Sequence, residues 1–543
     1  MTDNVVPSLL RGFPLILPEI VLAVTSCIVF LGGTVRASRH VWAGVSFFGI
    51  VLAFLFVPYA NDIGTAEGMN LFVSPISLDA LGQYTRLVAL SLGALLVLLS
   101  WDQLQDQHAG DYFGCLLVVV AGLSLTGSAN ELVTLFLALE LISIPTYIML
   151  YLPKHDDASQ EAALKYFMLS VFSSAILLFG FSYLYGLTGS TNISVLMHTL
   201  YQVQWDDSVQ VLNFENVPML SLIAVIMIIA GLGFKITAVP FHFYAPDVYQ
   251  GTSTVMAALL AVVPKVAGFV ALLRLFGFVT PQVLGITTTG SGTLLSPDVP
   301  VLLWFLAAIT MTVGNVFALL QKNLRRLLAY SSIAHAGYML IGLAATPYIP
   351  SSFRSGETGA EVLLLSGVAA VLLYLVAYAL MTVGAFAVIS YIDSEARPVE
   401  TEDDLAGLAR THPVLAIMMV VFMFSLIGIP FTAGFLGKLM VFFSALAVGP
   451  EHATFFRALA LIGMVNAAIG GWYYLRIITA MYLRTSIRPV EPKKSIPGFA
   501  TILLCAVFTI GLSIPPLSTW FWGMASNAGS GTPSLIQYDT EQQ

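Results

Sequence analysis

Fourteen long apolar runs constrain the fold of this chain more than any other feature of its sequence. A helix needs about 20 mainly apolar residues to cross the hydrocarbon core of a bilayer, where every backbone polar group must be paired within the protein. The runs fall near residues 13–34, 41–58, 79–100, 111–127, 129–152, 159–186, 218–239, 251–277, 300–320, 324–345, 360–392, 412–448, 454–483 and 497–523. The sequence therefore predicts an all-α polytopic membrane protein with about fourteen transmembrane helices.

The composition excludes several classes of protein. Hydrophobic residues make up 58% of the 543 residues and charged residues only 10%, whereas soluble domains carry about 25% charge. No basic patch with interleaved aromatics lies outside the apolar runs, so lipid rather than nucleic acid is the expected partner. Cys27, Cys115 and Cys505 are far apart, without the spacing of metal or iron–sulfur sites. We therefore expect no redox centre in this chain and, because the sequence also has no phosphate loop or flavin motif, no cofactor.

Basic residues between the runs predict the orientation, because cytoplasmic loops of membrane proteins are enriched in Lys and Arg. If the N-terminus faces outward, the outer loops and ends carry only Arg11, Arg354 and Arg457. The inner loops then carry Arg36, Arg39, Lys154, Lys322, Arg325, Arg326, Arg397, Arg410, Arg484, Arg488, Lys493 and Lys494. Both termini are therefore expected on the outer side, which is the periplasm in a bacterium.

The remaining basic residues lie inside the apolar runs: Arg86, Lys165, Lys235, Lys265, Arg274, Lys438 and Arg476. The arginines are interpreted as snorkelling side chains or structural ion pairs. A charge at the centre of a transmembrane helix costs about 2.5–3.5 kcal/mol on insertion scales. Burial disfavours the charged form of lysine, which suits a group that must load and release protons. The deep lysines 235, 265 and 438 are therefore predicted to carry protons.

Glu140 and His335 complete the set of titratable groups at depth. Glu140 lies about 16 Å along its helix, near the membrane midplane, so it needs a cation or a wet cavity, and Lys165 and Lys235 are the available partners. A single buried histidine is usually a satisfied core residue. Among so many buried titratable groups, His335 is instead predicted to accept and pass on a proton near neutral pH.

Two prolines predict broken helices and, with them, an internal repeat. Pro240-Phe241 and Pro430-Phe431 each follow an apolar run, and proline removes a backbone donor and interrupts a helix. If helices 4–8 and 9–13 form two five-helix units, each break lies in the fourth helix of its unit, and an odd count makes the second unit inverted. The predicted segments are 1–110 (three helices), 111–277 and 300–483 (the repeats), 497–525 (a C-terminal helix) and 526–543 (a disordered tail).

Three motifs resemble a known family. GFKITAVPFHFYAPDVYQG, AYSSIAHAGYMLIG and IPFTAGFLGK are similar to those of the antiporter-like subunits of the membrane arm of respiratory complex I, the proton-pumping NADH:quinone oxidoreductase. PDVYQG resembles the N type of this family, Lys438 stands where the M type has glutamate, and the L type has a long amphipathic C-terminal helix that this sequence lacks. Pro264, directly before Lys265, departs from the family pattern.

The resemblance implies roles for individual residues and for partner proteins. Glu140 and Lys235 become the coupled acid–base pair of a first half-channel, Lys165 its modulator, Lys265 and His335 a bridge along the membrane axis, and Lys438 the terminal proton carrier. M-type and K-type subunits are implied as neighbours in a bacterial inner membrane. NADH, FMN, iron–sulfur clusters and quinone are implied in partner subunits of this translocase.

Two other functions are alternatives, and the first of them shares this fold and most of these charges. One is a subunit of a multisubunit sodium/proton antiporter, which sodium-dependent transport would indicate. The other is the membrane subunit of an energy-converting hydrogenase or formate-linked complex, which co-purification with a nickel-iron protein would indicate. A purely structural spacer has no use for Glu140 and three lysines at depth.

Overall fold

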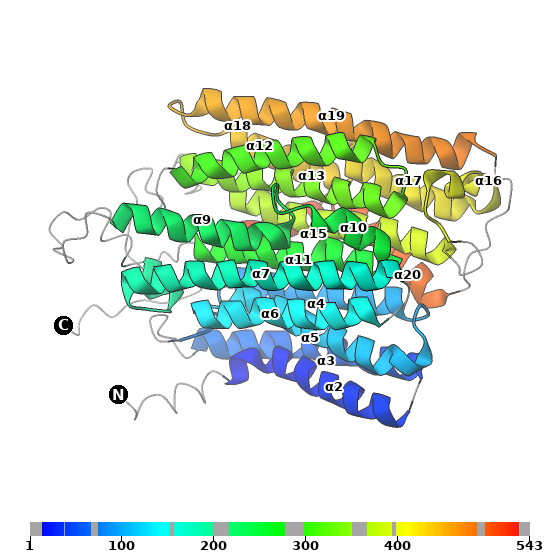
Figure 1. The fold of residues 1–543 in the computed structure, drawn as a ribbon, viewed down its shortest axis with the longest axis horizontal. Helices are drawn as coiled ribbons and strands as arrows, with labels where there is room; N and C mark the ends of the chain where they lie inside the picture. The colour runs from blue at the N-terminus through cyan, green and yellow to red at the C-terminus, as the bar shows by residue number, and fades with distance from the viewer. Residues whose placement is uncertain are drawn as a thin grey trace.

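The computed structural model describes residues 13–36, 38–66, 74–152, 157–197, 199, 217–276, 298–349, 366–393, 398–485 and 495–530. Across these residues the chain is almost entirely helical, with three isolated β-bridges as its only strand-like pairing. The helices lie side by side along the long axis of the molecule, as a bundle that crosses a bilayer requires (Figure 1). The predicted all-α membrane fold is confirmed.

Twelve helices in the described part of the chain are long and apolar enough to cross a membrane. They are α2 (Leu17–Val35), α3 (Arg39–Ala66), α4 (Ala80–Ser100), α5 (Ala109–Ser128), α6 (Leu132–Tyr151), α7 (Asp157–Thr188), α9 (Val217–Ile236), α11 (Thr254–Leu275), α12 (Asp298–Leu319), α13 (Leu324–Ala345), α15 (Gly367–Ile392) and α19 (Ala453–Leu483). The start of the predicted run 360–392 lies outside the described residues.

The other two predicted spans are each a pair of shorter helices. One pair is α17 (Pro413–Ile427) and α18 (Ala433–Leu446), and the second is α20 (Ile496–Gly511) and α21 (Leu517–Ser530). The second pair corrects the prediction of one C-terminal helix over 497–525, because two consecutive prolines, Pro515 and Pro516, cannot donate helical hydrogen bonds. Helix α21 also continues to Ser530, into the segment predicted as a disordered tail, with Ala525 and Ala528 fully buried. Residues 531–543 of that tail lie outside the described part.

Both predicted helix breaks are present. Helix α9 ends at Ile236, the backbone turns at Thr237 with a φ of 60°, and the short helix α10 (Tyr244–Gly251) begins after Pro240. Helix α17 ends at Ile427, Gly428 has a φ of 91°, and α18 begins after Pro430. In Figure 1, α10 lies to the right of α9 and α18 to the left of α17, so the two broken spans run in opposite directions. Inverted repeats require this arrangement, and their superposition after a rotation of about 180° remains a prediction.

Three helices form the interior of the bundle. The most apolar windows of α11 and α15 are 100% buried and that of α13 is 94% buried, whereas those of α2, α7, α12 and α19 are only 39% buried and present apolar side chains outward. Lys265 lies on α11 and His335 on α13. Both side chains are therefore held inside the protein, away from lipid.

The arginines within the apolar runs form structural ion pairs, as predicted. Arg86 Nε and Nη2 donate to the two carboxylate oxygens of Glu19 at 2.8 and 3.0 Å, Arg274 pairs with Asp79, and Arg476 Nε lies 2.6 Å from Glu402. Arg86 also donates to the carbonyl oxygen of Leu15. These pairs join α4, α11 and α19 to distant parts of the chain.

Breaking the Arg86–Glu19 pair is expected to destabilise the protein strongly. Their side chains are 0% and 4% exposed, so Glu19→Gln leaves a buried arginine without its counter-ion, a change that costs about 3–5 kcal/mol. The exposed Arg484–Asp403 pair is the matched control, and Asp403→Asn should cost less than about 1 kcal/mol. Melting temperature and assembly yield in mild detergent measure both variants, and equal stability of the two would contradict a structural role for the buried pair.

Candidate functional site

The predicted pair of Glu140 and Lys235 forms between α6 and α9. Lys235 Nζ lies 3.9 Å from Glu140 Oε1, and the lysine side chain is 5% exposed. Each group has a hydroxyl as its nearer partner: Lys235 Nζ donates to Ser143 Oγ at 2.7 Å, and Ser174 Oγ donates to Glu140 Oε1 at 2.5 Å. Glu140 and Ser143 share a face of α6 because they are three residues apart. The opposite charges of Glu140 and Lys235 are therefore close enough to interact, while each side chain is held in place by a hydrogen bond with a serine.

The break in α9 places Lys235 at a helix end. The lysine is the second-last residue of α9, so it lies beside carbonyl groups that have lost their helical donors. The segment after the break takes up two of these acceptors, because Ala238 N–H donates to the carbonyl oxygen of Gly233 and Tyr244 OH to that of Phe234. Lys235 therefore takes its partners from α6: the hydroxyl of Ser143 and the carboxylate of Glu140.

Lys165 does not contact Glu140, which corrects the expectation that either lysine could be its partner. Its side chain is 40% exposed, and its Nζ lies 2.6 Å from Glu161 and 3.0 Å from Asp247. Glu161 is four residues earlier on α7, where side chains meet on one helix face, and the break in α9 brings α10 with Asp247 alongside. Arg326 on α13 also contacts Asp247 at 2.8 Å. A modulating role for Lys165 remains a prediction.

Lys265 is buried in the centre of the bundle. Helix α11 continues through Pro264, so this departure from the family pattern does not interrupt the helix. The side chain is 1% exposed, and its Nζ donates to the carbonyl oxygen and Oγ of Ser332 at 2.5 and 2.6 Å. Tyr378 OH donates to the same Ser332 Oγ at 2.7 Å. Lys265 is therefore tied to α13 one turn before His335.

Gly268 places Lys235 close to the helix of Lys265. A Cβ atom at Gly268 would lie 2.5 Å from Ile236 Cγ2 and 3.5 Å from Lys235 Cβ, so only a residue without a side chain lets α9 approach α11 this closely. Gly268 is three residues after Lys265 and shares its face. The two lysines consequently lie on facing surfaces of adjacent helices.

His335 lies between two tyrosine hydroxyls. Its ring is buried, with Nδ1 2.7 Å from Tyr374 OH and Nε2 3.1 Å from Tyr474 OH. Tyr474 OH also shares a hydrogen bond with Ser331 Oγ. Sequence reasoning identified the histidine but none of these tyrosines. A tyrosine within a long apolar helix could have indicated a buried polar partner such as His335, because a buried tyrosine hydroxyl usually finds a hydrogen-bond partner.

Lys438 occupies the second break. Its side chain is 6% exposed, and its Nζ donates to the carbonyl oxygens of Leu426 and Ile427 at 2.7 and 2.8 Å. These are the last carbonyls of α17, which have no helical donor and carry the negative end of the helix dipole. A Cβ at Gly428 would lie 3.1 Å from Lys438 Cδ, so the left-handed glycine that ends α17 also leaves room for the lysine stem.

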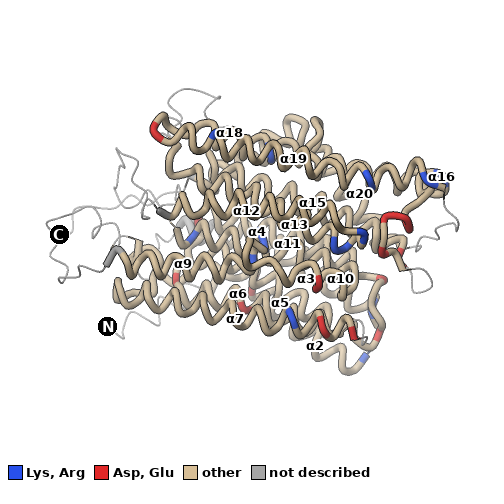
Figure 2. Tube along the Cα trace, turned by 45° about the horizontal axis from the view of Figure 1, so that its top comes forward, with Lys and Arg blue, Asp and Glu red and all other residues tan. Residues whose placement is uncertain are grey.

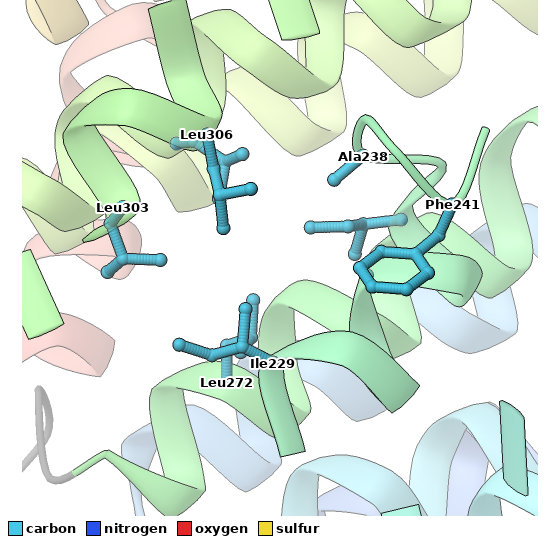
Figure 3. Close-up of a pocket in the computed structure, with 9 residues that line it drawn as sticks. Ile229, Ala238, Phe241, Leu272, Leu303 and Leu306 are labelled. Atoms are coloured by element: carbon cyan, nitrogen blue, oxygen red, sulfur yellow. The ribbon is translucent and has the colours of Figure 1, made fainter. Parts of the chain in front are cut away.

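The buried titratable groups thus follow one another through the bundle, on α6, α9, α11, α13 and α18. Figure 2 shows that charged residues are sparse along the middle of the bundle and gather mainly at one end. Beside the break in α9 lies a small cavity, and all the side chains that line it are apolar, including Ile229, Ala238, Phe241, Leu272, Leu303 and Leu306 (Figure 3). This cavity offers no group for ion binding. Within the described residues, no three His, Cys, Asp or Glu side chains gather as metal ligands.

Comparison with known proteins identifies the class. The family model described as "NADH:quinone oxidoreductase/Mrp antiporter, TM" matches residues 129–354 and 359–470. The chain belongs to this family. It is 36% identical to NADH-quinone oxidoreductase subunit N of Trichlorobacter lovleyi over 86% of this chain and 87% of that one. The subunit N of Desulfovibrio desulfuricans is 35% identical, over 96% of this chain and 99% of its own.

Solved structures agree with this assignment. A chain of respiratory complex I from Thermus thermophilus is 28% identical with a TM-score of 0.71, covering 94% of this chain and 99% of that one. A chain of the Mrp complex from Dietzia is 19% identical with a TM-score of 0.70, over 98% and 97% of the two chains. The second likeness is a likeness of fold alone.

Proposed function

We propose that this chain is the N-type antiporter-like subunit of a proton-pumping NADH:quinone oxidoreductase, and that Glu140, Lys235, Lys265, His335 and Lys438 carry its protons. The observation that supports this most is that the nearest partners of each group are hydroxyls or backbone carbonyl oxygens, and that the Glu140–Lys235 contact, at 3.9 Å, is longer than the bond of either residue to its serine. A hydroxyl can donate or accept a hydrogen bond, and a carbonyl oxygen can accept one from a charged or a neutral amine, so both kinds of partner remain bonded when a lysine loses its proton. Arg86, in contrast, is clamped by two bonds to one carboxylate.

The Glu140–Lys235 geometry supplies a means of coupling. Two unit charges about 4 Å apart interact by roughly 4 kcal/mol at an effective dielectric constant of 20. A change that separates the pair, or that protonates Glu140, therefore makes Lys235 much readier to release its proton. Lys265 on the facing helix is the next acceptor, followed by His335 and Lys438. Since packed helices lie about 8–10 Å apart, water must link groups beyond direct hydrogen-bond reach.

The setting of the chain follows from the same assignment. We place M-type and K-type subunits beside it in a bacterial inner membrane, and NADH, FMN, iron–sulfur clusters and quinone in partner subunits that drive the pump. The excess of Lys and Arg in alternate loops supports an outward, periplasmic position for both termini. Lys165, bridged to Arg326 through Asp247, is proposed to modulate the Glu140–Lys235 pair from a distance.

Purification in mild detergent tests the assignment against its alternatives. The whole complex, reconstituted in vesicles, is expected to take up protons when NADH reduces quinone, with no requirement for sodium. Co-purifying proteins are identified from the same preparation. Sodium-dependent transport by an assembly without NADH oxidation, or co-purification with a nickel-iron protein, would instead assign the chain to an antiporter or to a hydrogenase.

A further inference from the structure

Four side chains in the second half of the bundle form one continuous chain of hydrogen bonds. Ser331 Oγ bonds to Tyr474 OH, Tyr474 OH lies 3.1 Å from His335 Nε2, and His335 Nδ1 lies 2.7 Å from Tyr374 OH. The groups come from α13, α19 and α15 and are almost fully buried. We propose that this chain is a proton wire, and that Tyr374 and Tyr474 relay protons to and from His335. The proposal rests on the function assigned above.

The chemistry of the four groups allows two directions of donation. A neutral imidazole has one N–H donor and one acceptor nitrogen, so one tyrosine must donate to it while the other accepts from it. Ser331 can donate to Tyr474 or accept from it. When Nδ1 carries the proton, the donors run from Ser331 through Tyr474 to Nε2, and from Nδ1 to Tyr374. In the other tautomer every bond is reversed.

A proton can therefore cross the wire without leaving any charge behind. One proton arrives at Ser331 Oγ, whose own proton moves to the Tyr474 oxygen. The Tyr474 proton moves to His335 Nε2, the Nδ1 proton moves to the Tyr374 oxygen, and the Tyr374 proton leaves. Each hydroxyl has lost one proton and gained one, and the imidazole is again neutral, in the other tautomer. The wire must reset before a second proton follows.

Each end of the wire lies beside a residue that neighbours one of two buried lysines, Lys265 on α11 and Lys438 on α18. Ser331 precedes Ser332, whose Oγ accepts from Lys265 Nζ. At the far end the ring of Tyr374 packs on α18, where a Cβ at Gly437 would lie 2.4 Å from Tyr374 Cδ2. Gly437 directly precedes Lys438. The wire thus begins next to the serine that binds Lys265 and ends at a ring that packs on the helix of Lys438.

Removing single hydroxyls tests the wire in the reconstituted whole complex. Tyr374→Phe and Tyr474→Phe keep both rings, and each is expected to slow NADH-driven proton uptake at least about tenfold, in line with the loss of a positioned proton-transfer group. The residual uptake should show a larger rate ratio between H2O and D2O than the unmodified complex, because proton transfer then limits the rate. Tyr338→Phe is the matched control, since the Tyr338 ring packs on His335 but its hydroxyl bonds to Asn315.

The outcomes separate the wire from the proposed function. Unchanged uptake in both tyrosine variants, equal loss in Tyr338→Phe, or slower uptake with an unchanged H2O/D2O ratio would each overturn the wire. Should a tyrosine variant assemble poorly, Ser331→Ala removes the end partner of Tyr474 with a smaller change and is expected to slow uptake in the same way, whereas normal uptake would again overturn the wire. Normal proton uptake by the His335→Gln variant would instead refute the proposed proton route through Lys265, His335 and Lys438.

Discussion

Glu140→Gln is expected to abolish coupled proton uptake while the complex still assembles. Glutamine keeps the length of the side chain, and its carbonyl can still accept from Ser174 Oγ, so the packing between α6 and α7 is preserved. It cannot bind and release a proton, and it removes the negative charge 3.9 Å from Lys235. Without that charge the buried lysine is no longer held in its protonated form. We expect uptake to fall at least about tenfold.

Lys235→Ala should remove uptake equally, with a larger loss of stability because it leaves a partly buried carboxylate without its cation. Proton uptake and quinone reduction are measured together in vesicles that contain the whole complex. Glu131→Gln is the control, since Glu131 lies at the start of the same helix and bonds to Thr191 rather than to a lysine. Uptake at the normal rate by assembled Glu140→Gln would remove the pair from the proton route.

Replacement of Lys438 is expected to block proton transfer even when its charge is retained. Arginine stays protonated in proteins, so Lys438→Arg cannot release a proton to the outlet and should fail as Lys438→Ala does. Lys438→Glu is not expected to restore uptake, because the lysine is seated against the carbonyl oxygens of Leu426 and Ile427. An anionic carboxylate would be repelled by those oxygens and by the negative end of the α17 dipole.

The three variants are compared with Lys322→Ala, which removes a lysine from the loop between α12 and α13 and should leave uptake unchanged. Assembly is checked by the quinone reductase rate of the purified complex. Full pumping by Lys438→Arg would show that only a fixed positive charge is needed at this position, and proton loading of Lys438 would have to be abandoned.

The transmembrane helices, their two breaks and the depths of the buried titratable groups could be predicted from the sequence, because unpaired backbone groups and unpaired charges cost too much free energy in a bilayer. Long apolar runs give helices, since unpaired backbone groups are too costly in hydrocarbon. Pro240 and Pro430 interrupt helices through the missing N–H. The depths of Glu140 and His335 follow from counting residues along a helix. Each of these depends on local sequence and on the membrane, so no knowledge of helix packing was needed.

Tertiary structure alone decided which side chains meet. Lys165 pairs with Asp247 instead of Glu140, Lys438 takes its partners from the end of α17, and Tyr474 reaches His335 across 139 positions of sequence. Such contacts depend on how each helix is rotated and offset against its neighbours, and in a span that is apolar all round the sequence carries little periodic signal for that rotation. Small residues such as Gly268 and Gly437, by allowing close approach, fix the packing that brings the proton-carrying groups together.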